Sequence, residues 1–305
     1  MPSLQDPHSR LPAPTPPAGE AIDSLLQAAL FEDRGPGDLT TEVAIAPHCM
    51  AHGELLAKDA GVLAGGGIFR RIFELVDPGV QCEQRVAEGA SFQRGEVLFV
   101  LHGPARSLLI AERTALNFIQ RLSGIASLTQ QHVALCQGRA AILDTRKTTP
   151  GLRALEKYAV RCGGGQNHRF GLFDEVMVKD NHIDASGLTL QALLQQLRAA
   201  HGPEVRMTAE ARDRDEALQA LAGDADVILL DNMSPAEMRE LSAELRAAES
   251  QVPKRTRAVL LEASGGIDLS NVAEISTTGV DRISIGALTH SVKALDLSLS
   301  LEILR

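Results

Sequence analysis

The chain has no tryptophan, one tyrosine and four cysteines in 305 residues, and it contains no long apolar run. Scarce aromatic rings argue against the stacking surfaces that bind single-stranded nucleic acid, so no nucleic-acid partner is expected. Cys49, Cys82, Cys136 and Cys162 are widely spaced without a C-x-x-C pair. This pattern predicts neither a zinc site nor a disulfide framework and fits a reducing cytoplasm. No stretch reaches the roughly 18 apolar residues of a membrane span, so no membrane partner is expected.

Basic residues are also in the minority, with 30 Lys and Arg against 39 Asp and Glu and a formal net charge of −9. Such a protein repels polyanions at long range, so an anionic ligand would need a local basic cluster. The length suits one β/α barrel, which needs about 250 residues, or two domains. The proline-rich residues 1–19 are predicted to form a disordered arm with no targeting role.

Six short apolar runs in the second half each end in a polar residue or glycine, with helical patterns in most of the gaps between them. Strands that alternate with helices and carry reactive groups at their carboxyl ends are typical of a β/α barrel active site. One end of the barrel would then collect the residues that finish these runs. The runs are Ala140 to Thr145, Glu175 to Lys179, Val205 to Glu210, Val227 to Asp231, Ala258 to Ser264 and Arg282 to Gly286.

The first part of the chain reads as a separate α/β unit over residues 20–122. Apolar residues recur with helical period from Glu20 to Leu30, and a β-rich stretch covers residues 90–100. The glycine cluster at residues 61–67 indicates tight turns, because no Lys-Ser or Lys-Thr follows it as in a phosphate-binding loop. A long helical pattern from Leu108 to Cys136 leads into a barrel domain at residues 123–290. Residues 291–305 could close the barrel or pack on the first domain.

Basic residues concentrate between residues 144 and 183, within a chain that is acidic overall. Arg offers a planar fork for carboxylates and phosphates, whereas Lys acts as a point charge, so the mixture suits a ligand that carries both groups. Arg146, Lys147 and Lys179 follow predicted strands, which favours a functional role. Three others, at four-residue spacing, are predicted to form only the solvated face of a helix: Arg153, Lys157 and Arg161.

These residues belong to a long motif, DTRKTTPGLRALEKYAVRCGGGQNHRFGLFDEVMVKDNH at residues 144–182. Together with ERTALNFIQRLSGIAS at 112–127 and EASGGI at 262–267, it resembles the quinolinate phosphoribosyltransferase family from about Ala21 onwards. The resemblance implies an incomplete TIM-like β/α barrel with an N-terminal α/β sandwich domain. It also implies that the nitrogen of quinolinate attacks phosphoribosyl pyrophosphate. Loss of pyrophosphate and of the 2-carboxylate as carbon dioxide would give nicotinate mononucleotide for NAD biosynthesis.

The resemblance also assigns roles to residues that match the family motifs. Lys147, Lys179, Glu210 and Asp231 are the implied catalytic residues, Lys147 facing the phosphoribosyl donor and the two carboxylates facing ribose hydroxyls and Mg²⁺. The two quinolinate carboxylates would be held by Arg113, Arg146, His168, Arg169 and Lys179, with Thr145 beside them. The 5-phosphate would lie by Ser264, Gly265, Gly266, Ile285, Gly286 and Ala287. A homodimer is implied, with Arg113 delivered to the neighbouring subunit's site.

Two features depart from the family or stay open. Where the family usually has two alternating glutamates, this chain reads Met207-Thr208-Ala209-Glu210, so we expect altered metal affinity or donor positioning. His182 either orients a neighbour, contacts a phosphate or is structural, and His290 could reach the phosphate region.

Three other functions compete with this one. A Schiff-base aldolase would use Lys179 as its nucleophile. A phosphometabolite-binding protein could retain the same scaffold, and a related transferase could act on nicotinate or another pyridine.

Overall fold

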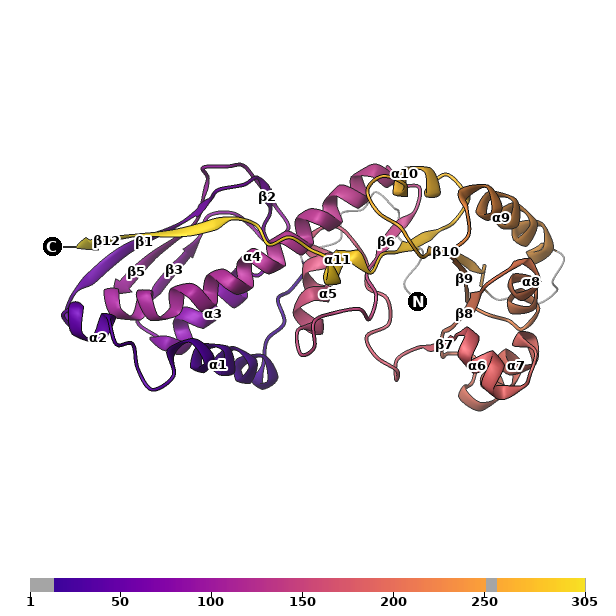
Figure 1. Ribbon diagram of the computed structural model, residues 1–305, viewed down its shortest axis with the longest axis horizontal. Coiled ribbons are helices and arrows are strands. Elements are labelled where there is room, and N and C mark those ends of the chain that lie inside the picture. Colours follow the sequence, from indigo (N-terminus) through magenta and orange to yellow (C-terminus); the bar gives the residue numbers. More distant parts are fainter. Residues whose placement is uncertain (1–13, 251–256, 305) are drawn as a thin grey trace. The chain divides into compact units, whose positions relative to one another are not determined.

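The computed structural model describes residues 14–250 and 257–304, and its contacts divide the chain into two compact units (Figure 1). The first unit holds the residues up to Gln130, Thr148–Gly164 and the residues from Leu288 onwards, and the second holds Gln131–Lys147 and Gly165–Ala287. Of the predicted arm, residues 1–13 lie outside the described residues, and residues 14–19 contain neither helix nor strand. None of the described helices combines the length and apolar character that crossing a membrane requires.

The first unit is built on a four-stranded antiparallel sheet in the order β12-β1-β5-β3. Burial alternates along β1 because successive side chains of a strand point to opposite faces. The predicted helix from Glu20 is confirmed as α1, and the helical pattern near Leu108 as α4. The sheet strands are β1 (Met50–Ala57), β3 (Gln81–Gln84), β5 (Val97–Pro104) and β12 (Leu297–Leu304), and the helices are α1 (Glu20–Arg34), α2 (Thr41–Ala44), α3 (Gly66–Val76), α4 (Ala105–Cys136) and α5 (Arg153–Cys162).

The glycine cluster forms a turn between the short strand β2 (Gly61–Val62), which pairs with β4 (Ser91–Phe92), and α3. Gly65 has a φ of +95°, a left-handed conformation that glycine adopts without strain. The Glu88 carboxylate accepts hydrogen bonds from the backbone N–H groups of Gly65, at 3.1 Å, and Gly66, at 2.5 Å. A side chain of the protein therefore occupies the position that a phosphate would take in a phosphate-binding loop.

Helix α5 corrects one expectation. Lys157 was predicted to lie on a solvated helix face, but only 4% of it is exposed. Glu156 beside it is fully buried, and Arg121 of α4 donates to its carboxylate at 2.6 Å. Helix α5 packs inside the first unit along this side, so its charged residues at four-residue spacing do not share one solvated face.

The second unit contains one parallel sheet of six strands in the order β6-β11-β10-β9-β8-β7. β6 and β7 are its two edges, so the barrel is incomplete, as the resemblance implies. All six predicted strands are confirmed. They are β6 (Ala141–Leu143), β7 (Val176–Val178), β8 (Met207–Ala211), β9 (Val227–Asp231), β10 (Leu260–Ser264) and β11 (Arg282–Ser284).

Helices follow most of these strands, and local sequence explains where they begin. Ser234 caps α9 by accepting the Glu237 N–H at 3.3 Å, with Pro235 at the first helical position. Asp213 caps α8 in the same way, through the Glu216 N–H at 2.9 Å. The helices are α6 (Asp180–Ser186), α7 (Leu190–His201), α8 (Arg214–Ala222), α9 (Pro235–Glu249), α10 (Val272–Ile275) and α11 (Ala287–His290).

Candidate active site

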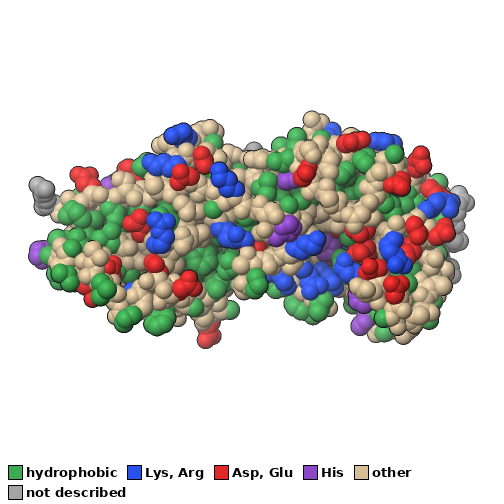
Figure 2. Space-filling view, in the orientation of Figure 1, with side chains coloured by type: hydrophobic (Ala, Val, Ile, Leu, Met, Phe, Trp, Pro, Cys, Tyr) green, Lys and Arg blue, Asp and Glu red, His purple; other side chains and the backbone are tan. Residues whose placement is uncertain are grey.

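Apart from Arg113, the predicted site residues lie in the second unit, and all of these except His168 and Arg169 lie at or just beyond the carboxyl ends of its strands. Because the strands are parallel, these ends meet at one edge of the sheet. On the face drawn in Figure 2, basic side chains gather beside acidic ones in the right half of the view, where Figure 1 draws the parallel sheet. Arg113 is an exposed residue of α4 in the first unit.

Each strand contributes its own part of the set. Thr145, Arg146 and Lys147 follow β6, Lys179 follows β7, Glu210 lies on β8 and Asp231 ends β9. Ser264 ends β10 and is followed by Gly265 and Gly266, Ile285 and Gly286 follow β11, and Ala287 begins α11, while His168 and Arg169 lie between α5 and β7.

Lys179 and Glu210 form an ion pair between neighbouring strands, Nζ to Oε2. The Lys179 side chain is 44% exposed and that of Glu210 is 11% exposed. The Lys179 backbone N–H donates to His182 Nδ1 at 2.9 Å, so His182 orients its neighbour. The pair brings an ammonium and a carboxylate together where the sequence led us to expect both.

His168 is buried and has protein partners for both ring nitrogens. Its Nδ1 accepts the Arg169 N–H at 2.8 Å, so the ring hydrogen is on Nε2, which lies 3.4 Å from Glu262 Oε1. That separation is long for a hydrogen bond, but it keeps the ring against a carboxylate. Asp144 accepts the His168 N–H at 2.9 Å. The ring and the backbone of His168 are thus fixed from both sides.

Glu262 is a fully buried carboxylate at the centre of this arrangement. It accepts from Arg282 Nε at 2.6 Å, across the paired strands β10 and β11. Burial alone would raise the pKa of Glu262, but the nearby His168, Arg282 and Ser284 outweigh it and lower the pKa to about 2. Glu262 therefore stays ionised at neutral pH below the edge that carries Ser264.

Arg169 is a buried cation with incomplete pairing. Its Nη1 donates to the Glu175 carbonyl oxygen at 3.0 Å, whereas its buried Nε has no hydrogen-bond partner among the described residues. Burial lowers the pKa of Arg169, Arg146 lowers it further, and the carboxylates of Glu175 and Asp174 oppose them. Two cations held close together favour a ligand with more than one negative charge.

The glycine loop after β10 comes close to the end of β9. Gly265 has a φ of +95°, and a Cβ there would lie 2.1 Å from Asn232 Oδ1. Asn232 donates its backbone N–H to the Ser264 oxygen at 2.9 Å and its side-chain amide to Asp231 Oδ2 at 2.7 Å. Glycine at position 265 is therefore required by the approach of this neighbour as well as by its backbone conformation.

Two family models match this chain. The quinolinate phosphoribosyl transferase N-terminal domain matches residues 38–123, and the C-terminal domain of the same enzyme matches residues 125–300. The chain belongs to the quinolinate phosphoribosyltransferase family.

Relatives of this family are similar over nearly the whole chain. The probable nicotinate-nucleotide pyrophosphorylase [carboxylating] of Bacillus subtilis is 44% identical, over 92% of this chain and 94% of the relative. The nicotinate-nucleotide pyrophosphorylase [carboxylating] of Mycobacterium leprae is 41% identical, over 92% and 98%. The crystal structure of NadC from Streptococcus pyogenes superposes with a TM-score of 0.88 at 40% identity, covering 95% of this chain and 100% of that one.

The described residues of this chain offer few carboxylates for a metal ion. Within the described residues, no group of three or more His, Cys, Asp or Glu side chains could hold a metal ion. Glu210 and Asp231 alone, at the ends of adjacent strands, fit an ion that shares its coordination with substrate oxygens. They do not form a metal site made by protein alone.

Three residues of the site went unassigned in the sequence: Asp144, Glu175 and Glu262. Glu262 lies two residues before Ser264, so the alternation of a strand places both side chains on the same face. That spacing was a signal available from sequence. Glu175 and Asp144 act through contacts between separate segments, which spacing along the chain does not reveal.

Proposed function

We propose that this chain transfers the phosphoribosyl group of phosphoribosyl pyrophosphate to the nitrogen of quinolinate. Quinolinate also loses its 2-carboxylate as carbon dioxide, which yields nicotinate mononucleotide and pyrophosphate on the route to NAD. The observation that carries the proposal is the buried Arg169, on which the charge of Arg146 acts, in the same unit as the Lys179–Glu210 pair. A dianionic acceptor needs fixed cations, and the donor's ribose needs a carboxylate.

The acceptor would be held through its two carboxylates. We assign them to Arg113, Arg146, Arg169 and Lys179, with Thr145 alongside. His168 supports them by fixing the backbone of Arg169, since its Nδ1 accepts the Arg169 N–H. Preorganised cations of this kind counter the repulsion between a dianion and a polyanionic donor before the reaction begins.

The donor would be held at the opposite side of the same edge. Glu210 and Asp231 face the ribose, where positive charge develops as pyrophosphate departs, and Lys147 faces the phosphates. Ser264, Gly265, Gly266, Ile285, Gly286 and Ala287 surround the 5-phosphate. Mg²⁺, bound together with the donor by Glu210 and Asp231, would neutralise charge on the leaving pyrophosphate.

The loss of the 2-carboxylate uses the ring that has just been alkylated. When carbon dioxide leaves, the positive pyridinium nitrogen stabilises the electron pair that remains at C2. A proton then binds C2 through this electron pair. The residues that hold the remaining carboxylate keep the ring in place. A site that excludes water would favour this step by removing solvation from the departing carboxylate.

A direct assay tests the proposal. Quinolinate labelled in its 2-carboxylate is incubated with the protein, phosphoribosyl pyrophosphate and Mg²⁺, and labelled carbon dioxide and nicotinate mononucleotide are measured. Donor-dependent release of both, lost in Arg146→Ala and Lys179→Ala, is expected. A folded protein that releases neither product would overturn the assignment. Turnover of nicotinate without quinolinate turnover would point to the other pyridine transferase.

The aldolase alternative makes a different prediction for Lys179. Its ammonium is paired with Glu210, whereas a Schiff-base lysine must be an unprotonated amine. Borohydride trapping with sugar phosphates should therefore give no adduct at Lys179.

We further propose that the active unit is a homodimer in the cytoplasm. Arg113 belongs to the first unit, whereas the other assigned residues lie in the second, and Leu172 and Phe173 near Arg169 are 74% and 83% exposed. Apolar side chains this exposed suit an interface between subunits. The four free cysteines fit a reducing compartment. Sedimentation should show a dimer whose dilution lowers activity, and a fully active monomer would contradict the shared site.

A further inference from the structure

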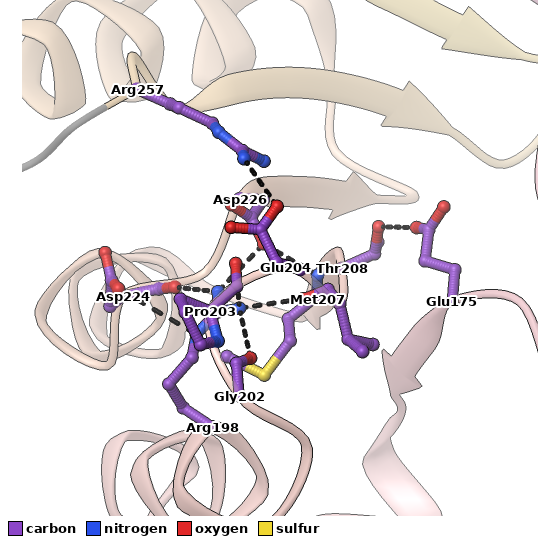
Figure 3. Close-up of polar contacts among 11 residues, drawn as sticks. Glu175, Arg198, Gly202, Pro203, Glu204, Met207, Thr208, Asp224, Asp226 and Arg257 are labelled. Carbon is purple, nitrogen blue, oxygen red and sulfur yellow. Dashed lines mark hydrogen bonds and ion pairs between the residues drawn. The ribbon is translucent and has the colours of Figure 1, made fainter.

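Glu175 and Thr208 form a buried pair next to Arg169, and the proposed reaction assigns no role to this pair. Glu175 lies directly before β7 and is 8% exposed, whereas Thr208 lies on β8 and is fully buried. The Thr208 hydroxyl donates to the Glu175 carboxylate, and Figure 3 shows the two side chains pointing toward each other. The register of the two strands places Met177 opposite Thr208, which explains the contact.

A buried carboxylate is costly unless other groups compensate its charge. The Thr208 hydroxyl hydrogen bond is one part of that compensation, and the positive charge of the nearby Arg169 guanidinium is another, since the Glu175 charge acts on it. Arg169 also donates to the Glu175 backbone oxygen at 3.0 Å. Glu175 therefore acts on Arg169 in two ways, through its main chain and through its charge.

The Glu175 charge opposes the effect that Arg146, a second cation, has on Arg169. Arg146 and Arg169 repel each other, and burial adds to the cost of keeping Arg169 charged. In the substrate-free protein, Glu175 offsets part of that repulsion. A bound dianion would do the same, so Glu175 and the substrate compete for one positive charge.

We propose that Glu175, held in place by Thr208, is a positioning residue that serves as the internal counter-charge of Arg169. It stabilises the substrate-free protein and, in return, weakens the binding of the pyridine dicarboxylate. The proposal rests on the proposed function, since it takes quinolinate as the ligand of Arg169. It assigns Thr208 a role in fixing a carboxylate supplied by the neighbouring strand.

Glu175→Gln tests the charge with little change of shape, because the amide oxygen still accepts from Thr208. We expect the Kd for quinolinate, measured by calorimetry, to fall about fivefold, since Arg169 would then face the dianion without the opposing charge of Glu175. The KM for phosphoribosyl pyrophosphate should change less than about twofold, and the Tm of the substrate-free protein should fall. A residue that merely fills space would lower the Tm without tightening the binding of one substrate.

Thr208→Val is the matched control, because it removes the hydroxyl but leaves the Glu175 charge. It should lower the Tm while the Kd for quinolinate stays within about twofold of the wild-type value. An unchanged or larger Kd in a folded Glu175→Gln protein would overturn the proposal, as would equal tightening in both variants. If the wild-type protein neither binds nor converts quinolinate, the proposed function fails, and this inference fails with it. Wild-type turnover with a Kd that Glu175→Gln leaves unchanged discards only the inference.

Discussion

Lys179 and Glu210 form an ion pair that we assign to the chemistry and expect to contribute little to the stability of the fold. The pair lies at the open edge of the sheet, and the Lys179 side chain is 44% exposed. Exposed ion pairs contribute little to stability because water screens them. We therefore expect activity and stability to respond separately to substitution of this pair.

We therefore expect Lys179→Ala to lower kcat about a hundredfold or more, since it removes one fixed cation from the developing charges. The Tm should move by less than about 2 °C. Lys58→Ala is the control, because Lys58 is an exposed lysine of the first unit outside the assigned site. Steady-state assays and thermal unfolding of both variants measure the two effects. A Lys179→Ala protein with wild-type kcat would remove Lys179 from the reaction.

Glu262 predicts how stability depends on pH. Its pKa of about 2 in the folded protein lies below the ordinary value of 4.5. A carboxyl with a lowered pKa contributes stability above the unfolded value, and this contribution is lost as the pH falls from about 4.5 towards 2. The contribution is of order 3 kcal/mol.

Glu262→Gln should lower the free energy of unfolding at pH 7 by about 3 kcal/mol, because it leaves Arg282 buried without its counter-charge. Urea titrations between pH 7 and pH 3 should show the gap to the wild-type protein narrowing in acid. Glu83→Gln, which replaces an exposed carboxylate, should leave the free energy of unfolding unchanged at both ends of this pH range. A gap that stays constant with pH would mean that Glu262 is not ionised in the folded protein.

At the scale of elements, the loop after β10 depends on two successive glycines with different requirements. Gly265 and Gly266 both have positive φ, +95° and +60°. A side chain at position 265 would meet Asn232, whereas nothing lies within 4 Å of a Cβ at position 266. The two positions therefore separate steric conflict from backbone strain.

Gly265→Ala should lower the free energy of unfolding by about 2–4 kcal/mol, and Gly266→Ala by about 1 kcal/mol. The first substitution must also displace Asn232, which donates to Asp231, so it should raise the KM for phosphoribosyl pyrophosphate more than the second does. Urea unfolding and steady-state kinetics of the two proteins provide the comparison. Equal costs at both positions would show that the Asn232 contact yields without penalty.

The elements of the parallel sheet were predictable because each strand is a short apolar run that ends in a polar residue or glycine. The buried contacts that side chains make with other segments were not predictable from the sequence. Thr208 reads in the sequence as a missing carboxylate, yet the structure places the Glu175 carboxylate against its hydroxyl from another segment. Lys157 has the spacing of a solvated helix face and is buried, because α5 packs within the first unit. Spacing reveals which residues share a face and not what that face contacts.

At the scale of the whole molecule, a strand near the C-terminus pairs with the first strand of the chain. Strand β12, at the end of the described chain, pairs with β1 along eight residues, from Met50 opposite Leu304 to Ala57 opposite Leu297. The sequence left open whether residues 291–305 close the barrel or pack on the first domain, because an apolar run does not identify its partner. The domain limits that we expected, 20–122 and 123–290, stay a prediction.

Removing residues 297–305 should therefore destabilise the first unit, because it deletes the partner of β1, which lies far away in sequence. It would leave β1 as an unpaired edge, and we expect the Tm to fall by more than about 10 °C with concentration-dependent aggregation. Deletion of residues 304 and 305 alone is the control, since Leu304 is 49% exposed. Thermal unfolding and light scattering measure both effects. A truncated protein with the wild-type Tm would show that β12 is dispensable.

Tyr158 has a consequence for how this protein can be observed in solution. It is the one tyrosine of a chain without tryptophan, and its hydroxyl donates to Glu88, the carboxylate that also receives the N–H groups of Gly65 and Gly66. The ultraviolet emission of the protein therefore comes from a single phenol, and a neighbouring carboxylate quenches such emission. Release of the Glu88 contact should brighten it, so a spectrometer can follow the start of α3 without any attached label.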